Sequence, residues 1–145
     1  MKCKIEIDVS RKEEVIIHAQ SITPLVKEIK RLCEEDGFEL IGYMDGAGVR
    51  LTLSEVCCFI VEDNKLWAVT RGEKFLLKYR LYQIEEQLPE YFVKINQSCI
   101  ANIKMIDRFD ASIGGTMTVK FKNGYTDWVS RRNLKHVKER LGLTK

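Results

Sequence analysis

Two short polar segments of this chain carry side chains that could hydrogen-bond the bases and phosphates of a nucleic acid. The first is Asn96-Gln97-Ser98, which interrupts an apolar run that begins at Phe92. Amide and hydroxyl groups can bond adenine edges or phosphate oxygens. Polar residues between two strands are also common as plain loops, so this segment alone fits both interpretations. Lys94, just upstream, favours the functional one.

The second segment, Ser130-Arg131-Arg132, begins a predicted helix. If Ser130 is the N-cap, both arginines occupy the first turn, where free backbone N–H groups already carry partial positive charge. Each cation at that position lowers the stability of the helix by about 0.3–1 kcal/mol. A bound anion would remove this cost, since guanidinium groups and helix N–H groups both bind phosphate oxygens. Arginine can also form a bidentate pair with guanine O6 and N7. The alternative is two solvated arginines. Lys135, one turn further along, joins the candidates.

Charge is distributed unevenly along the 145 residues. Residues 91–145 contain 11 Lys and Arg against 4 Asp and Glu, whereas residues 1–90 contain 13 against 17. The overall charge of +3 therefore conceals a C-terminal part with a balance of +7. Because a basic surface attracts polyanions, a nucleic acid is the expected partner of that part.

The other reactive residues argue against an enzyme, a metal site or a disulfide framework. The five cysteines include the neighbours Cys57 and Cys58 but no Cys-x-x-Cys pair, and there are two histidines. Zinc sites and disulfide frameworks need more regular spacing. No nucleophile and base lie close together in the sequence, so we predict no enzymatic activity and no cofactor. Most thiols are expected to be buried, and Cys99, beside the polar segment, is the one candidate for redox sensing.

The sequence contains no run of about 18 apolar residues, the length that a membrane-spanning helix needs. Its N-terminus alternates charged and apolar residues and so does not resemble a secretion signal. We therefore predict a cytoplasmic protein with one main domain.

The N-terminal residues change periodicity partway along. Lys2–Val9 alternates apolar and charged residues and predicts a strand, and Val15–Ile17 predicts a second one. Apolar residues then recur at helical spacing, with Thr23 as the predicted cap and Gly37 as the predicted end. The charged face of this helix has mixed sign, so the favoured interpretation is a helix packed on a sheet. The alternative is a dimerisation or effector-responsive helix.

The middle of the chain predicts short strands and tight turns. Asp45-Gly46-Ala47-Gly48 is expected to close a hairpin; it lacks the Lys-Ser/Thr of a phosphate loop. The continuously apolar Val56–Val61 is expected to be a central strand. The other predicted elements are the strands Phe38–Tyr43, Val49–Leu53, Leu66–Thr70 and Phe75–Tyr79 and a short helix from Leu81 to Leu88.

The C-terminal third predicts a hairpin followed by a helix. Thr116–Lys122 alternates, and Asn123-Gly124 is typical of a two-residue hairpin turn. Counting across that turn pairs Lys120 with Asp127 and places Trp128 on the buried face. After Ser130, a stripe of Leu134, Val137 and Leu141 predicts an amphipathic helix. The expected fold class is mostly β (α+β), with packed antiparallel strands and short helices.

The motif residues together resemble a known family. The run from Phe92 to Asn102, followed by Ile106, Asn123-Gly124 and Val129-Ser130-Arg131-Arg132, resembles the LytTR DNA-binding domain of bacterial transcription regulators. The resemblance covers about residues 45–143. It implies a mostly β fold that reads DNA by inserting loops into successive major grooves. Residues 1–44 then resemble the strand–helix extension of stand-alone members, too short for the receiver domain of a response regulator.

The resemblance also implies roles for particular residues. Asn96 and Gln97 match the polar pair of the first DNA-contacting loop, whereas the family often has His or a basic residue there. Ser98 and Asn102 match positions that shape this loop. The further matches are Lys94 near the first loop, Arg132 with Arg131 in the second loop, and Asn64 or Lys65 near a third contact region.

We therefore expect a transcriptional regulator that binds repeated half-sites of double-stranded DNA as a homodimer. Some stand-alone relatives are regulated by a membrane protein encoded nearby, so such a protein is a further candidate partner. The competing hypotheses are an RNA or single-strand binder and a protein-interaction module. The first is weakened by the lack of an aromatic stripe on a strand face, and the second leaves the terminal arginines unexplained.

Overall fold

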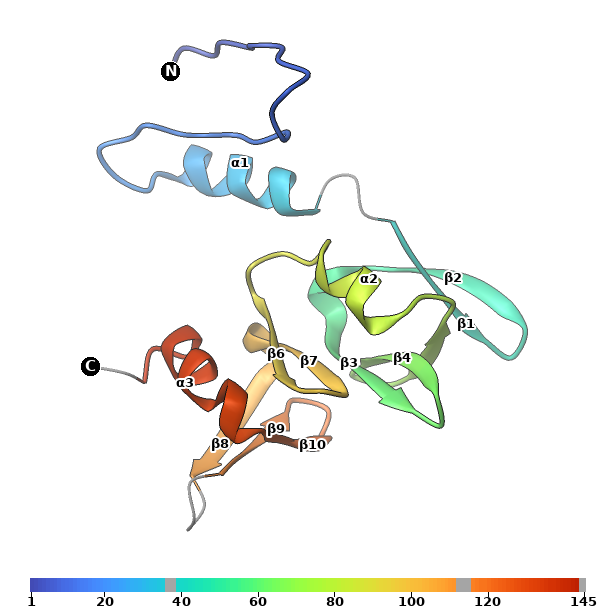
Figure 1. The fold of residues 1–145 in the computed structure, drawn as a ribbon. Coiled ribbons are helices and arrows are strands. Elements are labelled where there is room, and N and C mark those ends of the chain that lie inside the picture. Colours follow the sequence, from blue (N-terminus) through green and yellow to red (C-terminus); the bar gives the residue numbers. More distant parts are fainter. Residues whose placement is uncertain (36–38, 112–115, 144–145) are drawn as a thin grey trace. The chain divides into compact units, whose positions relative to one another are not determined.

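The computed structural model describes residues 1–35, 39–111 and 116–143. The chain forms two compact units, Met1–Asp36 and Gly37–Lys145, which we call unit 1 and unit 2. Figure 1 shows the helices and strands of both units. None of the helices in the described ranges is long and apolar enough to cross a membrane.

Unit 1 contains helix α1 (Pro24–Glu35). The Val26 amide donates to the hydroxyl of Thr23 at 3.3 Å, so Thr23 satisfies one of the free N–H groups of the first turn. Proline at the first helical position loses no hydrogen bond. The predicted helix and its N-terminal cap are confirmed. The predicted end at Gly37 lies outside the described residues.

The prediction of two strands before α1 is wrong for the single chain. Lys2–Val9 and Val15–Ile17 have irregular backbone, and Ile7 and Val9 are 91% and 101% exposed. A strand needs a neighbour to accept and donate its backbone hydrogen bonds. Within the described part of unit 1 no second segment takes that position, although the alternating pattern is present.

Unit 2 is built on a seven-stranded antiparallel sheet with the order β2-β1-β5-β4-β3-β7-β6. Its strands are β1 (Leu40–Met44), β2 (Ala47–Leu51), β3 (Val56–Glu62), β4 (Lys65–Thr70), β5 (Lys74–Leu77), β6 (Phe92–Asn96) and β7 (Cys99–Asn102), with the short helix α2 (Leu81–Glu85) between β5 and β6. The first five residues of β3 are buried, and β3 pairs with both β4 and β7. The predictions of a central strand at Val56 and of a hairpin at Asp45-Gly46 are confirmed.

A second sheet of three antiparallel strands, in the order β10-β9-β8, completes unit 2. It comprises β8 (Ile106–Ala111), β9 (Met117–Phe121) and β10 (Thr126–Val129), and helix α3 (Arg131–Arg140) follows. On β9, Met117, Val119 and Phe121 point inward as predicted. The predicted pairing across the hairpin is wrong by one residue, because Thr126, not Asp127, faces Lys120.

The shift arises from the turn between β9 and β10. The Phe121 amide donates to the Tyr125 carbonyl at 2.8 Å, and the Gly124 amide donates back to the Phe121 carbonyl at 2.9 Å. Three residues, not two, therefore form the loop, and Gly124 has a φ of 89°. This geometry matches a type I turn followed by a left-handed glycine. A one-residue change of register reverses the faces of a strand, so Trp128 is 55% exposed, not buried.

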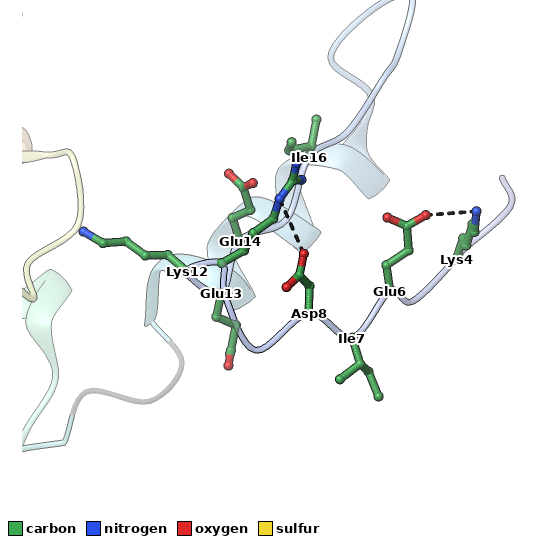
Figure 2. A pocket seen from close by; sticks show the side chains of 9 residues that line it. Lys4, Glu6, Ile7, Asp8, Lys12, Glu13, Glu14 and Ile16 are labelled. Carbon is green, nitrogen blue, oxygen red and sulfur yellow. Dashed lines mark ion pairs between the residues drawn. The ribbon is translucent and has the colours of Figure 1, made fainter.

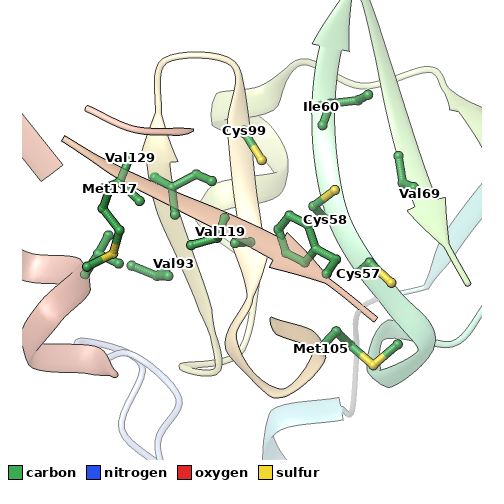
Figure 3. Close-up of a cluster of buried hydrophobic side chains, with 14 residues drawn as sticks. Cys57, Cys58, Ile60, Val69, Val93, Cys99, Met105, Met117, Val119 and Val129 are labelled. Carbon is green, nitrogen blue, oxygen red and sulfur yellow. The ribbon is translucent and has the colours of Figure 1, made fainter. Parts of the chain in front are cut away.

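One apolar cluster joins the two sheets and α3. Its buried members include Val93 and Ile95 from β6, Val119 from β9, Val129 from β10 and Val137 from α3. Leu134 and Leu141 pack at its edge, as the predicted stripe on the last helix requires. Figure 3 shows that Cys57, Cys58 and Cys99 project into the same cluster. The prediction that most thiols are buried is confirmed, since three of the five are.

Thiol labelling should separate the cysteines into two groups. Cys3 and Cys33 are exposed and should react within the mixing time of a maleimide reagent. Burial raises the pKa of Cys57, and a hydrogen bond with Cys58 together with burial raises the pKa of Cys99 well above its ordinary value. The reactive thiolate is therefore scarce. Mass spectrometry should find two labels on the native protein and five after denaturation. A third rapid label would contradict this packing.

Candidate nucleic-acid interface

The first polar segment forms the turn between β6 and β7. Gln97 and Ser98 are exposed, and the carbonyl of Ser98 accepts the Val61 amide of β3 at 2.9 Å. This bond ties the turn to the end of the central strand. The side chains of Gln97 and Ser98 are therefore presented to solvent from a backbone that is held on one side by the sheet.

Asn96 lies inside the protein, with 3% of its surface exposed. Its amide nitrogen donates to a carboxylate oxygen of Asp127 at 3.0 Å and to the carbonyl of Trp128 at 2.8 Å. Its amide oxygen accepts the backbone N–H of Ser98 at 2.8 Å. The Asn96 side chain thus connects the β6–β7 turn to β10, which lies about thirty residues further along the chain.

Asp127 completes this connection from β10. One carboxylate oxygen accepts the Asn96 amide and the Trp128 backbone N–H, the latter at 2.8 Å. The other accepts the hydroxyl of Tyr125 at 2.9 Å. Burial raises the pKa of Tyr125, and the hydrogen bond to Asp127 adds to this shift, so the phenol remains a donor. Sequence analysis missed Asp127 because the assumed turn length placed it on the outer face.

The second polar segment begins α3 beside the first. The Ser130 amide donates to the Ile95 carbonyl at 2.8 Å, which joins the end of β6 to the start of the helix. Ser130 is at the N-cap position as predicted, although its hydroxyl accepts the side-chain amide of Asn133 and not a backbone N–H. Arg131 and Arg132 occupy the first turn and are exposed, and no hydrogen bond or ion pair of Arg132 is found among the described residues.

Lys135 is also exposed, one turn along α3. Residues three and four apart share a helix face, so Lys135 lies on the side of α3 that carries Arg131 and Arg132. The start of α3 therefore presents three cations to solvent. Their charges add to the partial positive charge of the free N–H groups of the first turn.

Lys94 lies at the border of this region. Its ammonium is 3.8 Å from a carboxylate oxygen of Glu85 on α2, and both side chains are partly exposed. Both side chains line a cavity of about 230 Å³ whose wall also includes Asn133 and His136 of α3. Lys94 is therefore near α3 but is directed towards Glu85.

The third predicted region is the β3–β4 turn, where Asn64 and Lys65 are exposed. Asp63 and Asn64 have positive φ values of 53° and 60°, as a tight primed turn requires. Since β7 runs antiparallel to β3, this turn and the β6–β7 turn leave the sheet at the same end. With the start of α3 bonded to the end of β6, all three predicted regions meet at this end, which we call the loop face.

The loop face can form hydrogen bonds and bind anions, and its chemistry comes from amide, hydroxyl, ammonium and guanidinium groups. Within the described ranges no cluster of His, Cys, Asp and Glu is arranged to hold a metal ion. The backbone carbonyl of Trp128, which Asn96 binds, also lies here, and the Trp128 residue is 55% exposed. Sequence analysis missed this exposure, and only the true length of the β9–β10 turn could have revealed it.

Comparisons with known proteins find similarity to DNA-binding transcription regulators. Residues 47–142 match the model of the LytTR DNA-binding domain family. A protein of Staphylococcus aureus strain RF122, described as an uncharacterized HTH-type transcriptional regulator, is 34% identical over 146 residues, covering 99% of both chains. A relative with the same description from strain NCTC 8325 is 33% identical with the same coverage. The match to these relatives includes unit 1.

A solved structure also has this fold. It is the LytTR DNA-binding domain of a Bacillus cereus protein described as a methyl-accepting/DNA response regulator, with a TM-score of 0.68 and 21% identity. The similarity covers 72% of this chain and 96% of that one. The described residues contain no two helices joined by a short turn, so the "HTH-type" of the relatives' names does not describe this fold. By its family model, its relatives and its mostly β architecture, this chain belongs to the LytTR family of DNA-binding domains.

Proposed function

We propose that this protein binds specific sequences of double-stranded DNA through the loop face and thereby regulates transcription. The observation that carries the proposal is the hydrogen-bond network of Asn96, Asp127 and the Trp128 carbonyl. It holds two exposed polar segments side by side although about thirty residues separate them in sequence. A rigid arrangement of amide and guanidinium groups is what base recognition in a major groove requires.

Each exposed residue has a role in this proposal. Gln97 pairs with adenine N6 and N7, and Arg132 with guanine O6 and N7, because these bidentate pairs fit the side chains. Asn96 is buried and positions the loop instead of touching DNA. The residues that neutralise or hydrogen-bond phosphate are Lys65, Lys94, Ser98, Arg131 and Lys135. Asn64, in the β3–β4 turn, belongs to the same group of DNA contacts.

The proposal also covers the oligomeric state, the cellular location and the source of the input signal. A single module of this size buries a modest area on DNA, so the protein acts as a homodimer on repeated half-sites. It acts in the cytoplasm, where bacterial DNA lies. A regulatory membrane protein remains a candidate source of the input signal, supported by family resemblance alone.

Binding to single strands is a second candidate because Trp128, whose backbone carbonyl binds Asn96, is an exposed aromatic residue. An exposed aromatic ring can stack on an unpaired base. One tryptophan, however, is less than the series of stacking platforms that single-strand binders use. Competition by single strands distinguishes this candidate from duplex binding.

The proposal is tested by selecting a randomised duplex library with the purified protein at two salt concentrations and sequencing the retained DNA. We expect enrichment of a repeated motif, with an affinity that falls steeply as salt rises. A single-stranded competitor of the same sequence should displace little of the bound duplex. Retention without enrichment would reduce the loop face to a non-specific basic surface, and preferential displacement by single strands would favour the second candidate.

A further inference from the structure

Taken by itself, unit 1 leaves much of its apolar surface uncovered. In its described part, nine large apolar side chains are more than half exposed: Met1, Ile5, Ile7, Val9, Val15, Ile16, Ile22, Leu25 and Leu32. An isolated helix as short as α1 is also marginal in water. Both features show that unit 1 needs a further surface to cover its apolar side chains.

The segment Lys2–Asp8 carries a charge pattern that is complementary to itself. Its polar positions read Lys2, Lys4, Glu6, Asp8, with the cations first and the anions second. When two copies lie antiparallel with Ile5 opposite Ile5, Lys2 faces Asp8 and Lys4 faces Glu6 on both sides of the two-fold axis. On the other face, Cys3 faces Ile7. All cross-strand pairs are then either opposite in charge or both apolar, and each kind stabilises an antiparallel pair.

Other alignments of the two copies are worse. Parallel pairing in register places like charges opposite each other along the whole polar face. An antiparallel shift by two residues in one direction sets Lys4 against Lys4, and the shift in the other direction sets Glu6 against Glu6. A one-residue slip would move the apolar side chains to the polar face. The sequence therefore specifies one register, centred on Ile5.

In the single chain three of these charges form ion pairs with residues close in sequence. Lys4 lies 3.0 Å from Glu6, and Arg11 lies 3.8 Å from Asp8. Figure 2 shows both ion pairs and shows Ile7 pointing away from the side that carries Lys4 and Glu6. The carboxylate of Asp8 also accepts the backbone N–H and the hydroxyl of Ser10, which turns the chain just after the segment.

The balance of charge favours a second copy over a charged partner. Unit 1 contains 7 Lys and Arg against 8 Asp and Glu, whereas unit 2 contains 17 against 13. Two copies of unit 2, at +4 each, repel each other, whereas two copies of unit 1, at −1 each, repel far less. Covering an aliphatic side chain removes on the order of 60–120 Å² of apolar surface, so the nine from each of two copies together provide roughly 1,000–2,000 Å². This is the area that a specific dimer buries.

We propose that unit 1 is a dimerisation module in which Lys2–Val9 pairs antiparallel with the same segment of a second copy about a two-fold axis at Ile5. A two-stranded ribbon alone is marginal, so the apolar stripes of the two α1 helices cover its apolar face. The strand that the single chain lacks forms when this partner supplies its backbone hydrogen bonds. The inference deepens the homodimer part of the proposed function and does not depend on DNA binding.

The test uses two variants of the full chain that cannot pair with themselves. One carries Lys2→Glu and Lys4→Glu, which makes the polar face wholly acidic, and the other carries Glu6→Lys and Asp8→Lys, which makes it wholly basic. Sedimentation velocity without DNA should show a dimer for the wild type and a dimer dissociation constant raised roughly tenfold or more for each variant alone. An equimolar mixture of the two variants should dimerise again.

The mixture is decisive because ion pairs within one chain cannot account for recovery on mixing. A control with Lys27→Glu and Lys122→Glu, which has the same net charge as the acidic variant, should dimerise like the wild type. A monomeric wild type, variants that still dimerise alone, or a mixture that stays monomeric would each overturn the inference. All variants should still bind a single DNA half-site; if the wild type dimerises but binds no DNA, the proposed function fails and the dimer stands.

Discussion

Replacement of Asn96 by Ala is expected to lower the free energy of unfolding by about 2–4 kcal/mol, because a buried group that loses its hydrogen-bond partner costs about 1–3 kcal/mol. The change removes the donor from Asp127 and from the Trp128 carbonyl and the acceptor from the Ser98 amide. Chemical denaturation followed by circular dichroism measures the loss. Gln97→Ala, one residue along and exposed, should change stability by less than about 0.5 kcal/mol.

The variant Asn96→Asp tests the direction of the bond. It keeps the shape of the side chain but sets a carboxylate where the amide donates to Asp127 at 3.0 Å. Two carboxylates so close cannot both ionise without a cost. The variant should therefore be destabilised at pH 7 and should recover part of its stability relative to the wild type at lower pH, as one carboxylate takes up a proton. Wild-type stability at pH 7 would show that the amide does not hold the two segments together.

Replacement of Arg132 by Ala is expected to weaken binding to the selected DNA site by roughly 5- to 150-fold, which corresponds to about 1–3 kcal/mol for a bidentate contact to a base. Binding to random duplex should fall less. Removal of a cation from the first turn of α3 should also leave the protein as stable or up to about 1 kcal/mol more stable. Fluorescence anisotropy at fixed salt and thermal melting measure the two effects.

A variant at the far end of the same helix controls for net charge. Arg140→Ala removes one positive charge from the last turn of α3, away from the loop face. It should leave site preference unchanged and should not gain stability, because a cation is favourable at a helix C-terminus. Equal losses on specific and random DNA for Arg132→Ala would make this residue a phosphate contact. A large loss of stability would mean that its side chain supports the fold.

Several elements followed from local signals in the sequence. Thr23 and Pro24 set the start of α1, the continuous apolar run from Val56 set a buried strand, and Ser130 set the start of α3 with two arginines in its first turn. These signals act between residues a few positions apart, so a pattern of periodicity and capping residues is sufficient to identify them. β8 was not predicted because five of its six residues are exposed, and it therefore shows no apolar alternation.

The sequence by itself determined the fold class, the starts of α1 and α3, the basic C-terminal part and the residue types at the loop face. The tertiary structure decided which of those residues point outward: Gln97 and Trp128 do, and Asn96 does not. The reason is that these orientations depend on a single extra residue in the β9–β10 turn and on hydrogen bonds between residues about thirty positions apart. No local pattern encodes either of these, since both arise only when the two sheets and α3 pack around one core.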